Sequence, residues 1–121
     1  MAAPNLVNVT SIYGKTLGKA LTTSAAMALL CAADKVLKIN SIIVSNIDGT
    51  NNVDVTVTFY DTGTTTNFDI AKTVTVPSKS TLVVLGKDSP IYLEEGDQIS
   101  ALASAASDAQ MIISYEEMDD A

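Results

Sequence analysis

The chain has 121 residues and a hydrophobic content of 47%, which suits one domain with a modest core. Its seven basic residues are all lysines, set against 14 acids for a net charge of −7, so we expect no nucleic-acid partner, because phosphate contacts depend on basic side chains. The chain has no histidine, the commonest general base and zinc ligand, and we therefore expect a protein that is not an enzyme and needs no metal or cofactor.

Residues 1–12 are predicted to form an extended arm outside the core. They contain Pro4 and two asparagines, and their apolar residues alternate only loosely. An isolated extended segment cannot recover its backbone entropy, about 1–2 kcal/mol per residue, from a few partly covered side chains. We therefore expect the arm to bind another chain by strand addition. The predicted assembly interface consists of its apolar residues, Leu6, Val7, Val9 and Ile12.

The next segment, residues 17–33, carries conflicting signals. Its Ala, Leu and Met content favours a helix, whereas the period-two pattern that follows favours strands, and we predict a strand at 27–32 while helix stays open for the segment. The apolar run is too short and too interrupted for a membrane span or a signal peptide, so we expect a soluble, unprocessed chain with no membrane partner. Cys31 is the single cysteine and is expected to be a buried thiol.

Strand signals are clear from Val36 onwards. Residues 36–46 are rich in β-branched side chains and end in a turn-forming run at 48–52. Residues 53–61 alternate strictly, which predicts one buried and one exposed face. The predicted buried face is Val53, Val55, Val57 and Phe59, and the predicted exposed face is Asp54, Thr56, Thr58 and Tyr60.

Further strands are predicted at 68–76, 81–85, 91–93, 98–103 and 110–115, separated by turn signals. This spacing is typical of a β-sandwich or jelly roll. We predict an all-β fold, a single jelly-roll-like β-sandwich of about eight short antiparallel strands. Its predicted boundaries are an arm at 1–12, the sandwich domain at 13–116 and an acidic tail at 117–121.

Two polar segments resemble chemical sites. The turn at 94–97 holds three acids that could offer oxygen ligands to calcium, but their spacing matches no EF-hand. The run at 78–80, Ser-Lys-Ser, could be read as a Ser–Lys dyad, but it follows Pro77 where a polar turn is expected. We interpret both as solvated turns and predict no catalytic, cofactor-binding or metal-binding residue.

Charge is distributed unevenly along the chain. Residues 1–60 carry four lysines and three aspartates, whereas residues 61–121 carry three lysines and eleven acids. The acidic half could complement another part of an assembly, or it could be a solvated face that keeps the protein soluble.

Several sequence blocks occur together in a defined order. They are Tyr13-Gly14-Lys15-Thr16, Ala20-Leu21-Thr22-Thr23-Ser24, Lys38-Ile39-Asn40-Ser41-Ile42, Val44-Ser45-Asn46, Val74-Thr75-Val76-Pro77-Ser78-Lys79-Ser80-Thr81-Leu82, Ile91-Tyr92-Leu93-Glu94-Glu95-Gly96-Asp97 and Ile113-Ser114-Tyr115-Glu116-Glu117. In this order and spacing the chain resembles short virion structural proteins of tailed bacteriophages, many of them marine or cyanobacterial, over residues 12–117.

The resemblance implies a β-sandwich incorporated into the virion, made in the host cytoplasm, with no catalytic residues to carry over. We expect a capsid decoration (cement) protein, or a neck or tail accessory protein, that forms a homo-oligomer. Its expected partners are other copies of itself and other virion proteins: major capsid, neck or tail proteins. The alternative is a receptor- or carbohydrate-binding module of a tail or head fibre.

Overall fold

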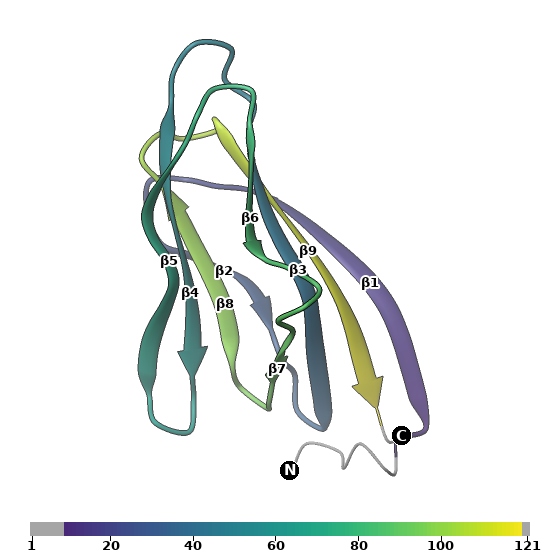
Figure 1. Ribbon diagram of the computed structural model, residues 1–121. Coiled ribbons are helices and arrows are strands. Elements are labelled where there is room, and N and C mark those ends of the chain that lie inside the picture. The colour runs from purple at the N-terminus through teal and green to yellow at the C-terminus, as the bar shows by residue number, and fades with distance from the viewer. Residues whose placement is uncertain (1–8, 120–121) are drawn as a thin grey trace.

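The computed structural model describes residues 9–119, which form nine strands in two antiparallel sheets and no helix (Figure 1). The predicted all-β sandwich is therefore confirmed. Within these residues no helix is long and apolar enough to cross a membrane. The strands are β1 (Ser11–Ala20), β2 (Ala26–Leu30), β3 (Lys35–Asn46), β4 (Val53–Asp61), β5 (Thr66–Val76), β6 (Thr81–Leu85), β7 (Ile91–Leu93), β8 (Gln98–Ala103) and β9 (Ala109–Asp119).

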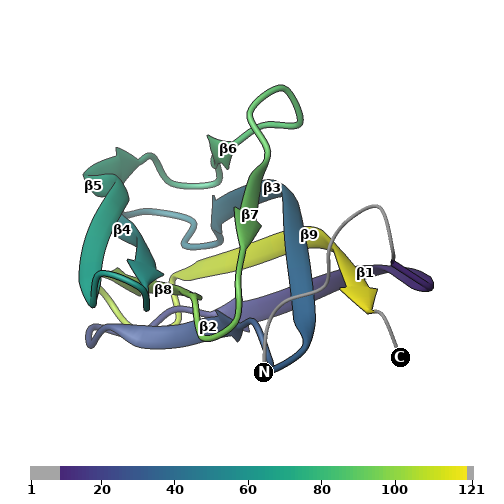
Figure 2. The ribbon, with the colours of Figure 1, turned by 90° about the horizontal axis from the view of Figure 1, so that it is seen from below.

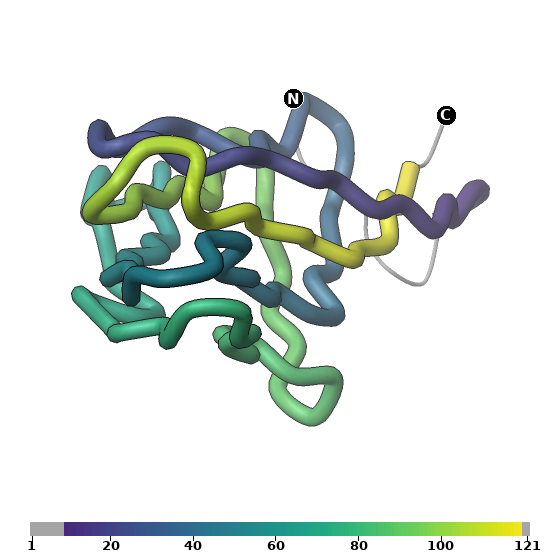
Figure 3. Tube along the Cα trace, turned by 90° about the horizontal axis from the view of Figure 1, so that it is seen from above, coloured from purple at the N-terminus to yellow at the C-terminus, as the bar shows by residue number. Residues whose placement is uncertain are grey.

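The two sheets differ in how they are assembled. One has the order β1-β9-β3-β6, with β7 also paired to β3, and the other has the order β2-β8-β4-β5. Figure 2 looks along the sandwich from below and separates the two sheets. Figure 3 shows β1 and β9, from opposite ends of the sequence, running side by side, as their antiparallel register from Ser11–Asp119 to Ala20–Gln110 requires.

The core lies between the sheets and is built from alternate residues of the strands, because successive side chains of a strand point to opposite faces. The predicted register of β4 is confirmed, since Val53, Val55 and Val57 are no more than 1% exposed. Phe59 is half-buried instead, where it packs against the core and stacks on Phe68 with ring centroids 6.3 Å apart.

The opposite face of β4 is less open than predicted. Asp54, Thr56, Thr58 and Tyr60 are all half-buried rather than exposed. The reason is that β4 is an inner strand, flanked by β5 and β8, so side chains of both neighbours cover part of this face.

The ambiguous segment at 17–33 contains strand, not helix. Its first residues belong to β1 and residues 26–30 form β2, which pairs with β8. Helix propensity amounts to at most about 0.7 kcal/mol per residue among these residue types, and pairing with a sheet edge outweighs it. The predicted strand at 27–32 therefore exists, one residue earlier at its start and two shorter at its end.

The expected arm and tail boundaries both fall inside strands. Ser11 and Ile12, assigned to the arm from the sequence, belong to β1 and pair with Asp119 and Met118 of β9. Residues 117–119, assigned to the acidic tail, belong to β9. The two segments hold each other in place, because each supplies the backbone partner that the other lacks.

Candidate assembly surface and groove

Strand β1 forms a long free edge of its sheet. It pairs with β9 on one side, and no other strand in residues 9–119 pairs with it. A free edge presents backbone N–H and C=O groups that another chain can pair with, and natural edges are often protected by proline or bulges. The register of β1 with β9 runs over ten residues without a shift, and β1 contains no proline. The edge is therefore open to strand addition.

The face of this sheet that points away from the core is here called the outer face. On β1 the outer face carries Gly14, Thr16 and Gly18. These residues lie opposite Glu116, Ser114 and Ile112 of β9, and directly opposed residues of two paired strands point to the same face. A Cβ placed on either glycine would meet no heavy atom within 4 Å. Packing within the subunit therefore does not require these glycines.

An apolar row crosses the outer face. Val83 of β6, Ile43 of β3 and Ile112 of β9 are direct cross-strand neighbours, and Ile112 lies opposite Gly18. Val83 is 62% exposed and Ile112 is 39% exposed, so no described segment covers the row. Exposed apolar groups arranged contiguously mark a contact surface more often than single exposed residues do.

A polar groove lies on the outer face beside this row. Its volume is about 430 Å³, and its lining side chains come from β3, from the β6–β7 loop and from β9. They are Lys38, Asn40, Ser41, Lys87, Ser114 and Glu116.

The groove exists because two short strands share one edge of β3. Strand β7 pairs with Leu37–Ile39 and β6 pairs with Ile42–Ser45, and between them the chain at 86–90 swings outward (Figure 2). Asn40 has no cross-strand partner among the described strands, since the register with β9 shifts between Ile39 and Ser41. A bulge of this kind bends the strand and redirects its side chains.

Charges in the groove are only partly compensated. Asn40 Nδ2 donates to Glu116 Oε2 at 3.2 Å. The ion pairs formed by described residues involve Lys15 and Lys35, and none involves Lys38 or Lys87. Within residues 9–119 the two groove amines therefore have no ion-pair partner.

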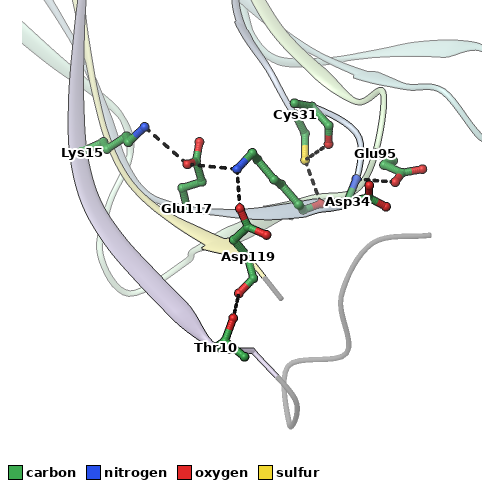
Figure 4. A network of polar contacts seen from close by, with 9 residues as sticks. Thr10, Lys15, Cys31, Asp34, Glu95, Glu117 and Asp119 are labelled. Carbon is green, nitrogen blue, oxygen red and sulfur yellow. Dashed lines mark hydrogen bonds and ion pairs between the residues drawn. The ribbon is translucent and has the colours of Figure 1, made fainter. Parts of the chain in front are cut away.

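A separate charged cluster fastens the end of β9 (Figure 4). Lys35 Nζ lies 2.7 Å from Asp119 Oδ2 and 3.5 Å from Glu117 Oε2, and Lys15 Nζ lies 3.4 Å from the same glutamate oxygen. Thr10 Oγ1 donates to the Asp119 carbonyl at 3.1 Å. The hydrogen bond to Asp119 raises the pKa of Lys35, so the lysine stays charged and keeps these acids in place.

The acidic turn at 94–97 is a structural junction, and at Asp97 it is buried and not solvated as predicted. Asp97 is 3% exposed, and its two carboxylate oxygens accept hydrogen bonds from the backbone N–H groups of Thr62 and Glu94, each at 3.0 Å. Glu95 accepts a hydrogen bond from the backbone N–H of Asp34 (Figure 4). Residues 9–119 contain no group of three or more ligands able to hold a metal ion.

The run Ser78-Lys79-Ser80 forms the turn between β5 and β6. The Ser80 N–H donates to the Pro77 carbonyl at 3.1 Å, and its hydroxyl donates to the Ser78 carbonyl at 3.4 Å. Lys79 adopts a φ of 60°, as a tight turn requires. Both serines therefore serve the turn, which agrees with the interpretation from the sequence.

Cys31 is buried, as expected. It is 1% exposed, and its thiol donates to the Lys35 carbonyl at 3.2 Å (Figure 4). Burial raises the pKa of the Cys31 thiol to about 11 from an ordinary value of 9.0. The folded subunit thus offers no reactive thiol to a neighbour.

Two of the four predicted interface residues, Val9 and Ile12, lie within the described chain. Leu6 and Val7 lie outside the described residues. Val9 is half-buried, whereas Ile12 is 62% exposed on β1. On one side Ile12 pairs with Met118 of the same subunit, and a contact of this segment with another chain stays a prediction.

Sequence reasoning did not find the groove or the apolar row. The row was visible only as isolated apolar residues, because its members come from three strands whose register no local pattern reveals. The exposed glycines of β1 were the one available signal, since glycine weakens a strand unless another group approaches closely.

Comparison with known proteins shows that the fold of this chain is similar to that of solved structures. No protein-family model and no curated protein matches the chain. A structure of Bacillus endospore appendages, described as disulfide-linked pili, matches with a TM-score of 0.54 and 17% identity, over 92% of this chain and 88% of that one.

Two structures of a pentameric capsid protein isolated from metagenomic phage sequences are more distant. Their TM-scores are 0.39 and 0.37 at 12% identity, over 98% of this chain and 67% and 66% of theirs. The appendage structure therefore shows a shared fold. The capsid structures have TM-scores too low to support a shared fold.

Proposed function

We propose that the chain is a non-enzymatic structural subunit of a tailed-phage particle, which works through contacts with copies of itself and with other virion proteins. The role we place first is capsid decoration, followed by a neck or tail accessory role. The sequence blocks that resemble virion structural proteins support the location in the particle. The observation that carries the assembly role is the outer face, where an uncovered apolar row ends at an open strand edge.

A second copy of the chain is the occupant that this surface fits best. Val83 and Ile112 leave apolar area in water, and burying such area contributes roughly 25 cal/mol per Å². Gly14 and Gly18 keep the β1 side of the outer face flat, which allows another backbone to approach closely. A self-complementary patch of this kind closes a two-fold dimer, the commonest symmetric assembly.

The shared fold with the endospore appendage is compatible with this role, because that structure belongs to an assembled pilus. The mode of linkage differs. Cys31 is the single cysteine and is buried in the subunit, so assembly here rests on non-covalent contacts. The assembled form is expected to survive reducing agents unchanged.

Replacing outer-face residues by lysine tests the proposal. We expect Val83→Lys and Ile112→Lys to abolish self-association measured by light scattering after gel filtration, and to reduce incorporation into particles. Met27→Lys is the matched control, because Met27 is 49% exposed on β2, in the other sheet. Assembly of the Ile112→Lys variant at wild-type level would rule out this surface.

Quantitative mass spectrometry of purified particles tests the location separately. A decoration protein is expected in far more copies than a fibre-tip module. Absence of the chain from purified particles would reject the virion role altogether.

A further inference from the structure

The polar groove lies on the outer face beside the apolar row, and it has the features of a small-molecule site. Its volume of about 430 Å³ falls within the range of roughly 300–1,000 Å³ that such sites occupy. It is formed by a strand bulge and by the gap between two strands, so its shape is fixed by the sheet and not by a mobile loop alone.

The charges in the groove indicate a ligand with a negative group. Lys38 and Lys87 come from separate elements and line the same hollow, and neither forms an ion pair with another described residue. On a chain with a net charge of −7, two lysines that line one hollow form a local positive site. A carboxylate can accept hydrogen bonds from both amines.

The remaining lining groups indicate that the ligand also carries hydroxyl groups. Ser41 and Ser114 can donate or accept, whereas the Glu116 carboxylate can only accept. A fully ionised inorganic anion such as sulfate would offer Glu116 no donor. A ligand with hydroxyls can donate to Glu116 while its own acid binds the lysines.

An aromatic side chain lies beside one of the groove lysines. Tyr92 of β7 is the direct cross-strand neighbour of Lys38, so both side chains lie on the outer face, and Tyr92 is 46% exposed. Its ring therefore offers an apolar surface next to the amines. The C–H face of a pyranose ring fits such a surface, because Tyr combines an apolar body with a polar tip.

From these features we propose that the groove binds an acidic sugar, meaning a pyranose ring that carries a carboxylate. Lys38 and Lys87 bind the carboxylate, Glu116 and the two serines bind ring hydroxyls, and Tyr92 contacts the ring face. The groove shares the outer face with the apolar row, but its lining residues are different from those of the row.

Titration of the full-length, isotopically labelled chain, followed by nuclear magnetic resonance, tests the site. The probes are methyl glucuronide and N-acetylneuraminic acid, with methyl glucoside as the neutral match and inorganic phosphate as the simple anion. We expect an acidic sugar to shift the amide signals of Asn40, Ser41 and Ser114. The acid that binds more tightly identifies the preferred class, uronic or sialic.

Three variants locate the recognition groups. Lys38→Ala and Lys87→Ala are each expected to weaken binding of the acidic sugar about tenfold, the loss typical of one charge-assisted hydrogen bond. Lys72→Ala is the matched control, because it removes an equal charge from β5 in the other sheet. Tyr92→Ala is expected to weaken binding and Tyr92→Phe to retain it.

Each contrary result overturns the proposal in a distinct way. Equal binding of phosphate would show an anion site only, and equal binding of methyl glucoside would show that the acid is not recognised. Absence of groove shifts up to the solubility limit of the sugars would show that no site exists. None of these results affects the assembly proposal, which is measured by the oligomeric state.

Discussion

At the scale of single residues, Asp97 joins three parts of the fold through one side chain and its backbone. Its carboxylate binds the N–H groups that begin the β4–β5 turn and the β7–β8 turn, and its carbonyl accepts from the Cys31 N–H at 3.0 Å. A buried carboxylate with both oxygens bound to backbone donors is a strong acceptor that no neutral group replaces.

We therefore predict that Asp97→Asn lowers the free energy of unfolding by about 1–3 kcal/mol, because the new NH₂ group faces a backbone donor and leaves it unsatisfied. Urea unfolding measures the change. The control is Glu94→Gln, an exposed neighbour in the same turn, which should alter stability little. Equal effects of the two substitutions would contradict this account.

The buried thiol of Cys31 makes a second prediction, about alkaline pH. Its folded pKa of about 11 lies above the ordinary value of 9.0, so the folded state holds the proton more tightly than the unfolded state does. The contribution to stability is complete below pH 9 and is lost as the pH rises toward 11. Between these values wild type should lose more stability than Cys31→Ala, as urea unfolding at each pH would measure. Parallel pH profiles for both proteins would show that the thiol does not titrate as described.

At the scale of elements, glycines in two different places should respond in opposite ways to alanine. Gly18 lies in β1 with free space around it, and Gly96 has a φ of 85° with Thr62 Oγ1 only 2.8 Å from where a Cβ would lie. Gly18→Ala should stabilise the monomeric subunit by about 0.5–1 kcal/mol, because glycine weakens a strand by that amount.

Gly96→Ala should destabilise the subunit, since both the backbone conformation and Thr62 oppose a side chain. Thermal unfolding at low protein concentration compares the two. Destabilisation by Gly18→Ala under these conditions would mean that β1 packs more tightly than the structure shows.

The sequence predicted most elements because one face of each strand had to be apolar. The alternation of Val53, Val55 and Val57 fixed the register of β4 before any contact was known. The sequence was ambiguous for β2, whose Ala, Met and Leu residues suit a helix equally well. It placed the start of β1 in an arm because Ser11 and Ile12 pair with Asp119 and Met118, over a hundred residues away in the sequence. The groove at Asn40 was not predictable, since it depends on a bulge and on where two other strands stop.

At the scale of the whole molecule, the two ends of the described chain lie together. Thr10 and Asp119 are hydrogen-bonded, and the cluster around Lys35 holds β1, β3 and β9 at the same end of the sandwich (Figure 4). Residues that precede β1 therefore start beside the end of β9, next to the open edge of the sheet.

Deletion of residues 2–8 should leave the fold intact and weaken assembly, because all nine strands of the described residues begin after them. Circular dichroism would measure the fold and light scattering the oligomeric state. The comparison is a chain in which Leu6 and Val7 are replaced by serine, which keeps the length but removes apolar surface. Unchanged assembly in both variants would reject the arm as an interface, and loss of folding would show that the arm belongs to the sandwich.

The position of β9 between β1 and β3 has a consequence for how the protein is made. The nascent chain exposes β1 first, but its partner strand leaves the ribosome only after roughly ninety further residues, a delay of order ten seconds at about 5–20 residues per second. Until then the edge of β1 is open on both sides and β3 lacks its main neighbour. The outer face therefore forms only after β9 has been synthesised, so assembly through it cannot begin before that point.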